Sequence, residues 1–219
     1  MKFLARGISI VFHPLLITMY VLILCMLINP YLFGVQDSKS IGVIIISVFL
    51  LSFFFPIISI LMMKALGLIS SLEMKDKRER IGPMIATAIF YLWLYINIKD
   101  NSVIPGAFSF FVLGATIAMF LAFFLNTFQK ISLHGVGVGG FLVVVMILGY
   151  QFSYGSFIVD VPMLGTYHID VFLLYIIAIF ITGITLTARL ILGAHNKEEL
   201  YGGLFIGAAS QLFGYAIFF

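Results

Sequence analysis

Charged residues are scarce in this sequence. They make up 10% of its 219 residues, while hydrophobic residues make up 63%. A soluble domain has roughly 25% charged residues, so the composition excludes an ordinary soluble domain, and nothing in it suggests a nucleic-acid partner. Cysteine is scarce too, and the single Cys25 excludes an internal disulfide. No small-residue cleavage site follows the first apolar run, so we interpret that run as a retained span rather than a signal peptide.

Long apolar runs take up most of the chain. A helix that crosses a membrane needs about 20 apolar residues. The sequence therefore predicts an all-α, polytopic transmembrane helical bundle of six or seven spans, forming a single domain over residues 1–219. The expected spans are residues 8–29, 41–63, 84–97, 107–128, 136–150, 169–192 and 200–219.

Several local features are predicted along these spans. Pro56 predicts a kink in the second span. The third span is short for a membrane crossing, and we expect it either to extend back to Ile81 or to lie partly in the membrane interface. His13 is interpreted as a residue at a helix end or in the interface rather than as a ligand, and residues 151–170 are expected to form a mixed loop.

Glycines are clustered in two of the later spans. Gly137, Gly139 and Gly140 lie near the start of the fifth span, and Gly203 and Gly207 lie four residues apart in the last span. Small residues in membrane helices let neighbouring helices approach closely. We therefore predict close packing at both places. For the first group, the approach of a substrate or loop to the backbone is the alternative.

Three polar segments interrupt the apolar runs, at residues 75–83, 130–135 and 189–199. Two spans separate the first segment from the second, and two more separate the second from the third. Because an even number of crossings returns the chain to the side it left, we predict that all three segments lie on one membrane face. The same count places the N-terminus on that face and the C-terminus on the other.

The charges are unequally divided between the two predicted faces. The face with the polar segments carries ten cations and five acids, whereas the opposite face carries two cations and four acids. Cytoplasmic loops of membrane proteins carry an excess of Lys and Arg. The distribution therefore favours a cytoplasmic position for the polar segments.

The third polar segment contains the residues best suited to binding and attacking a phosphate. Arg189 offers a planar fork of donors to an oxyanion, and His195 can act as a nucleophile or proton carrier. Glu199 follows His195 by four residues, so the two share a face of a helix, and a carboxylate there can hold the imidazole in one tautomer. The other two segments add further candidates: Lys75, Arg78, Arg80, Lys130, Ser132 and His134.

These segments resemble the three signatures of the type 2 phosphatidic acid phosphatase family, which are Lys-x6-Arg-Pro, Pro-Ser-Gly-His and Ser-Arg-x5-His-x3-Asp. Residues 188–199, Ala-Arg-x5-His-x3-Glu, match the third signature with Ala for Ser and Glu for Asp. Residues 131–134 keep the Ser and His of the second, and residues 75–83 keep the Lys and Pro of the first. The resemblance covers about residues 75–203, within a motif-bearing core of about residues 64–219.

The resemblance implies a membrane phosphatase that hydrolyses a lipid phosphate or diphosphate without a metal or cofactor. Candidate substrates are phosphatidate, phosphatidylglycerophosphate and polyprenyl diphosphates. It implies that His195 is the nucleophile, that Glu199 orients it, and that His134 protonates the leaving group. It assigns the phosphoryl oxygens to Arg189, Lys75 and Ser132, with further positive charge from Arg78, Arg80 and Lys130.

The resemblance also bears on location. Better-known members of the family act on the outer side of the bacterial inner membrane, so it implies a periplasmic site, opposite to the face that the charges favour.

Two functions of other classes stay open. A non-catalytic lipid-phosphate binder or carrier could use the same residues, because the first two signatures are incomplete. A small transporter is a third possibility, although we find no inverted repeat and no charged residue in mid-span, both of which transporters often show. The oligomeric state is left open by the sequence.

Overall fold

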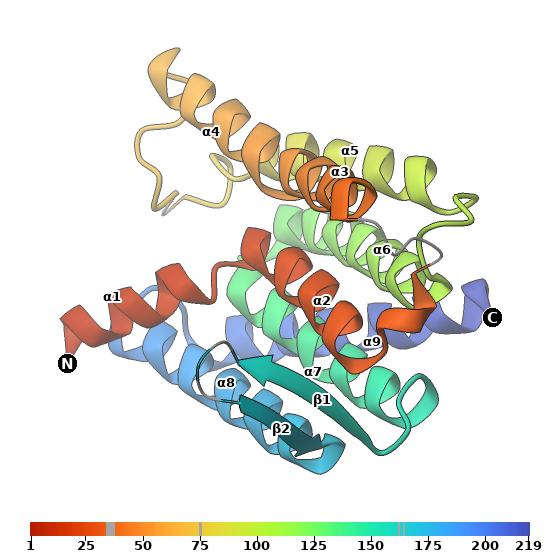
Figure 1. Cartoon of the computed structure of the whole chain (residues 1–219). Coiled ribbons are helices and arrows are strands. Elements are labelled where there is room, and N and C mark those ends of the chain that lie inside the picture. Colours follow the sequence, from red (N-terminus) through yellow and green to blue (C-terminus); the bar gives the residue numbers. More distant parts are fainter. Residues whose placement is uncertain (34–37, 75, 162, 164) are drawn as a thin grey trace.

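The computed structural model describes residues 1–33, 38–74, 76–161, 163 and 165–219. It confirms the predicted all-α membrane architecture (Figure 1). Six helices in the described part of the chain are long and apolar enough to cross a membrane, and two bent helices near the N-terminus add a seventh span if they are counted as one.

The helices follow the apolar runs. The N-terminal half contains α1 (Lys2–Val11), α2 (Pro14–Ile28), α3 (Ser38–Phe49) and α4 (Phe55–Ala65), with a 3-10 turn at Pro30–Leu32 and a π-helical turn at Leu50–Phe54. The C-terminal half contains α5 (Ile81–Ile98), α6 (Gly106–Phe128), α7 (Leu133–Gln151), α8 (Val171–Ile191) and α9 (Lys197–Phe218). Between α7 and α8, strands β1 (Ser156–Val161) and β2 (Gly165–Asp170) form an antiparallel hairpin.

The first span is not the continuous helix over residues 8–29 that the sequence predicts. It is broken between α1 and α2, whose axes differ by 55°. His13 lies at the break with extended backbone (ψ 136°), and its Nδ1 accepts a hydrogen bond from the Leu15 N–H at 3.4 Å. A residue before proline is disfavoured in the helical conformation, so Pro14 accounts for the break. The interpretation of His13 as a helix-end residue is confirmed.

The prediction of a mixed loop over residues 151–170 is wrong, because most of this segment forms the β-hairpin. Its strands are rich in Val, Ile, Thr and Tyr, which favour extended backbone. Phe157 on β1 is buried and anchors the hairpin to the bundle. Asp170 ends β2 and caps α8, because its carboxylate accepts a hydrogen bond from the Phe172 N–H at 2.7 Å.

The second and third spans both differ from plain helices with the predicted bounds. The π-helical turn Leu50–Phe54 ends two residues before Pro56, within the long span Lys39–Ala65. A kink at Pro56 itself stays a prediction. Proline lacks a backbone N–H, so the regular hydrogen-bond ladder cannot continue unchanged past it. The third span begins at Ile81, as its short apolar run suggests.

Helices α7 and α9 approach each other closely through their glycines. A Cβ atom built on Gly203 would lie 2.5 Å from the Ser132 carbonyl oxygen. Gly207 and Gly139 are at least as restricted, because a Cβ on Gly207 would overlap the Val136 carbonyl and one on Gly139 would overlap the backbone of α9. The prediction of close packing is confirmed at these positions, and the crossing brings the beginning of α7 against the beginning of α9.

The two ends of the bundle carry different loops. The connections α4–α5, α6–α7 and α8–α9 meet at one end, as their hydrogen bonds show. Figure 1 shows the N-terminus at that end and the C-terminus at the other. The three polar segments therefore lie at one end of the bundle, and their position on one membrane face stays a prediction.

The glycine crossing predicts a strong effect of side-chain volume at Gly207. Gly207→Val forces a side chain into the Val136 backbone, and we expect it to lower the free energy of unfolding by about 1–3 kcal/mol, as overpacked cores do. Thermal unfolding in detergent measures the change. Gly183→Val on α8 is the matched control, because a Cβ there meets nothing within 4 Å. Equal melting temperatures for the two variants would contradict this packing.

Candidate functional site

Side chains from the three polar segments bind backbone carbonyls of one another. Arg80, before α5, donates from Nη1 to the Ile131 carbonyl oxygen at 3.0 Å. Lys130, between α6 and α7, donates from Nζ to the Ala194 carbonyl oxygen at 2.9 Å. The first segment is thus joined to the second and the second to the third, so residues more than 100 positions apart in the sequence form one cluster.

His195 and Glu199 form the centre of this cluster. Their Nδ1 and Oε2 atoms lie 2.6 Å apart, and the two side chains are 2% and 20% exposed. Asn196 caps α9, because its Oδ1 accepts a hydrogen bond from the Glu199 N–H at 2.8 Å. The cap begins the helix directly after His195, which places the Glu199 carboxylate in the first turn beside the ring. The i, i+4 pairing predicted from the sequence is present.

The His195 ring is neutral at physiological pH. Burial, reinforced by the positive charges of Arg80, Lys130 and Arg189, lowers the pKa of His195 from 6.5 to about 3. A neutral ring bonded to a carboxylate carries its proton on Nδ1, so Nε2 keeps its lone pair. A ring nitrogen in this state, oriented by a carboxylate, is a nucleophile.

A second imidazole lies beside the N-terminal helix break. His134, in the first turn of α7, has its Nε2 2.9 Å from the Ser9 carbonyl oxygen of α1. His13 packs against it edge to face, with ring centroids 5.4 Å apart. The sequence did not connect Ser9 or His13 with His134. The only available signal was the His13-Pro14 pair, which predicts a helix boundary but not its neighbour.

Arg189, in the last turn of α8, supplies an unsatisfied donor. Its Nε is buried and has no hydrogen-bond partner among the residues that the structure describes. The guanidinium interacts electrostatically with His195 and His134, and also with Glu73 of the α4–α5 loop. A buried donor without a partner costs free energy, and an anion bound beside it would remove that cost.

The remaining candidates from the sequence have different environments. Ser132 is fully buried and caps α7 through a 3.2 Å hydrogen bond from the Gly135 N–H to its Oγ, so its first role is structural. Arg80 is also buried and uses its guanidinium on backbone carbonyls. Arg78 is exposed on the α4–α5 loop. Lys75 lies outside the described residues.

The cluster offers a cationic, partly buried environment around two imidazoles. Arg80, Lys130 and Arg189 provide positive charge, and Glu199 interacts electrostatically with Arg80 and Lys130. In the described ranges, no group of three or more His, Cys, Asp or Glu side chains is placed to hold a metal ion. The arrangement is suited to an oxyanion, which needs several donors and a net positive field.

Comparison with known proteins adds no further evidence. No protein-family model matches the chain. No curated protein and no solved structure matches it either. The function therefore has to be inferred from the residues and their geometry.

The environment of His195 predicts an unusual titration. We expect nitrogen NMR of labelled protein in detergent to show an unprotonated Nε2 of His195 from pH 8 to pH 5. Because the unfolded chain takes up this proton near its ordinary pKa of about 6.5 and the folded chain only near 3, the free energy of unfolding should fall as the pH drops from 6.5 towards 3. Titration of His195 near pH 6.5 would contradict the proposed burial and cationic field.

Proposed function

We propose that this protein is an integral-membrane phosphatase that hydrolyses a lipid phosphate or diphosphate through a histidine nucleophile. The observation that carries the proposal is the buried His195–Glu199 pair, 2.6 Å apart, within a cluster of three cations. The substrate class is that of phosphatidate, phosphatidylglycerophosphate or a polyprenyl diphosphate. The resemblance of residues 188–199 to a phosphatase signature supports the same reaction.

In the first step, Nε2 of His195 attacks the phosphorus atom. The P–N bond forms as the bond from phosphorus to the leaving oxygen breaks, and the leaving oxygen takes a proton. His134, protonated on both ring nitrogens, is the proposed donor of that proton, and it would give the proton from Nδ1 because its Nε2–H is bonded to the Ser9 carbonyl oxygen. General acid catalysis typically contributes about 10²–10⁴-fold in rate. Glu199 stabilises the ring as positive charge develops on it.

In the second step, water attacks the phosphorylated histidine. The P–N bond breaks, inorganic phosphate leaves, and His134 takes back a proton from the attacking water. Arg189, Lys130 and Arg80 neutralise the equatorial oxygens in both steps, with Arg189 contributing its unpartnered Nε. Phosphoryl transfer needs mainly such positioning and charge neutralisation, so the proposed reaction requires no metal ion.

We propose that the protein resides in a bacterial inner membrane, with the site and N-terminus on one side and the C-terminus on the other. The excess of Lys and Arg around the site favours the cytoplasmic side. The resemblance to the phosphatase family favours the periplasmic side.

The proposal predicts phosphate release from purified protein in the presence of a chelator. His195→Ala should lower kcat by about 10³-fold or more, because removal of a nucleophile removes the covalent route. His168→Ala makes the same substitution at an exposed position of β2, three residues before α8 begins, and should leave the rate unchanged. If wild type and His195→Ala release phosphate equally slowly from all three substrate classes, the protein is not a phosphatase of this kind.

A non-catalytic lipid-phosphate binder or carrier is the second candidate. Lys130 and Arg80 each use a donor on a backbone carbonyl. Their positive charge can still attract an anion, but fewer of their N–H groups are free to bind a transition state. The same samples separate the two functions. A binder retains a phosphatidate analogue in His195→Ala, loses it in Arg189→Ala, and shows no turnover in wild type.

A further inference from the structure

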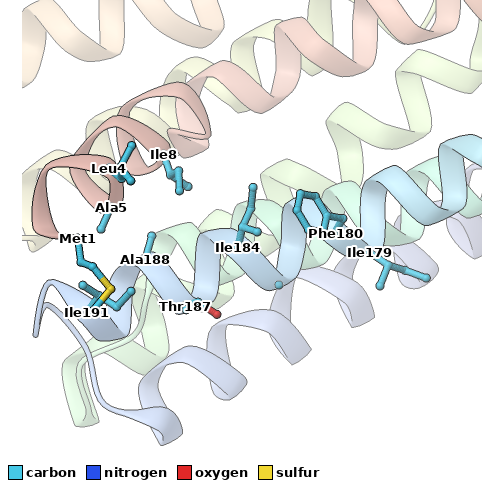
Figure 2. A pocket seen from close by; sticks show the side chains of 11 residues that line it. Met1, Leu4, Ala5, Ile8, Ile179, Phe180, Ile184, Thr187, Ala188 and Ile191 are labelled. Atoms are coloured by element: carbon cyan, nitrogen blue, oxygen red, sulfur yellow. The ribbon is translucent and has the colours of Figure 1, made fainter.

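An apolar groove runs along the outside of the bundle from the candidate site. It lies between α1 and the second half of α8 and has a volume of about 540 Å³. Figure 2 shows α1 lying along this part of α8, with Ile184 and Ala188 directed towards α1. The volume falls in the range of pockets that hold small-molecule ligands, roughly 300–1,000 Å³.

The groove is lined by hydrocarbon and is open to the surroundings of the bundle. Leu4 and Ile8 of α1 line it opposite Phe180 and Ile184 of α8. Leu4 and Phe180 are 68% and 65% exposed, so the groove faces outward on the surface that lipid covers. Gly183 contributes no side chain at its middle, and a Cβ there would meet nothing within 4 Å. The glycine therefore keeps the groove open.

The groove borders the polar cluster at two places in the sequence. Ile8 lines the groove, and the next residue, Ser9, places its carbonyl oxygen 2.9 Å from Nε2 of His134. Ala188 lines the groove, and the next residue is Arg189, with its buried and unpartnered Nε. On both helices, a residue that lines the groove is followed directly by a residue of the polar cluster.

The length of the groove corresponds to one leaflet of a bilayer. Ile179 and Ile191 mark its extent on α8, and the twelve-residue separation corresponds to about 18 Å at 1.5 Å per residue. One leaflet is roughly 15 Å deep, half of the roughly 30 Å hydrocarbon core. From Arg189 to Ile179 the distance along α8 is ten residues, or about 15 Å, so a lipid whose head group lies at Arg189 would extend its chain along this part of the groove within its leaflet.

We propose that this groove binds the hydrocarbon chain of an anionic lipid whose phosphate occupies the cluster around Arg189 and His195. This inference rests on the proposed function and adds the subsite that aligns the substrate. A chain already in the bilayer leaves no water behind when it enters the groove, so the groove gains only packing contacts. These contacts should orient the phosphate. Loss of the groove should therefore raise the KM for long-chain substrates and leave the KM for short-chain substrates unchanged.

The experiment uses a long-chain alkyl phosphate with a photoreactive diazirine at mid-chain, bound to full-length protein in lipid nanodiscs. Mass spectrometry should locate adducts on residues of α1 and α8 that line the groove. Excess phosphatidate should displace the probe, whereas excess phosphatidylcholine should not. Adducts spread evenly over the outer surface, or displaced equally by both lipids, would mean that bulk lipid alone fills the groove.

A pair of tryptophan variants tests the groove directly. Gly183→Trp fills it and should reduce the adducts and raise the KM for long-chain phosphates at least tenfold, with no change for a short-chain phosphate. Gly42→Trp on α3 is the matched control, because it also replaces a helical glycine whose Cβ has open space. Thermal unfolding of both variants confirms that they fold. Unchanged labelling in folded Gly183→Trp would overturn the proposal.

The test of the lipid subsite can succeed or fail independently of the test of the proposed reaction. Groove adducts that Gly183→Trp removes, in a protein that releases no phosphate, would overturn the phosphatase and leave the lipid subsite standing. Phosphate release that depends on His195, with adducts outside the groove, would overturn the subsite alone.

Discussion

The close crossing of α7 and α9 is the constraint on which the site depends. Glycines at the crossing let the backbones touch, so that the Ser132 N–H reaches the Glu199 carbonyl oxygen at 3.2 Å. One helix brings His134 and the other follows directly on His195. Because the contact is between backbones, it fixes the main-chain positions from which the two imidazoles extend. Membrane helices use small residues for this purpose since the hydrophobic effect contributes little between them.

An excess of positive charge around His195 is the second organising feature. Three cations surround a ring that burial keeps neutral, and one of them has a buried donor without a partner among the described residues. Such an arrangement is costly in an empty site and favourable around an anion. In the proposed function, the same residues would keep His195 nucleophilic and attract the phosphate. In the proposed lipid site, the cations would bind the phosphate of the head group and the apolar groove beside Arg189 would bind the hydrocarbon chain.

The features that the sequence predicts are those that depend on the helical repeat and on whether the number of membrane crossings is even or odd. Apolar runs located the spans, even numbers of crossings joined the three polar segments, and the i, i+4 spacing placed Glu199 beside His195. The contact of His134 with the Ser9 carbonyl was not predictable, because it depends on the direction the chain takes after the break at His13. The capping role of Ser132 and the carbonyl contacts of Arg80 were also missed. A polar residue near a helix end satisfies the backbone as readily as it binds a ligand, and spacing alone does not distinguish the two.

The central claim is that the converging segments place a phosphoryl group on His195. The most direct measurement is rapid quenching of the wild-type protein with phosphatidate carrying ³²P in its phosphate, followed by mapping of the labelled peptide. The account predicts an acid-labile, alkali-stable label on the peptide that contains His195. A label on another residue, or steady turnover with no labelled protein on the time scale of a single reaction, would contradict it.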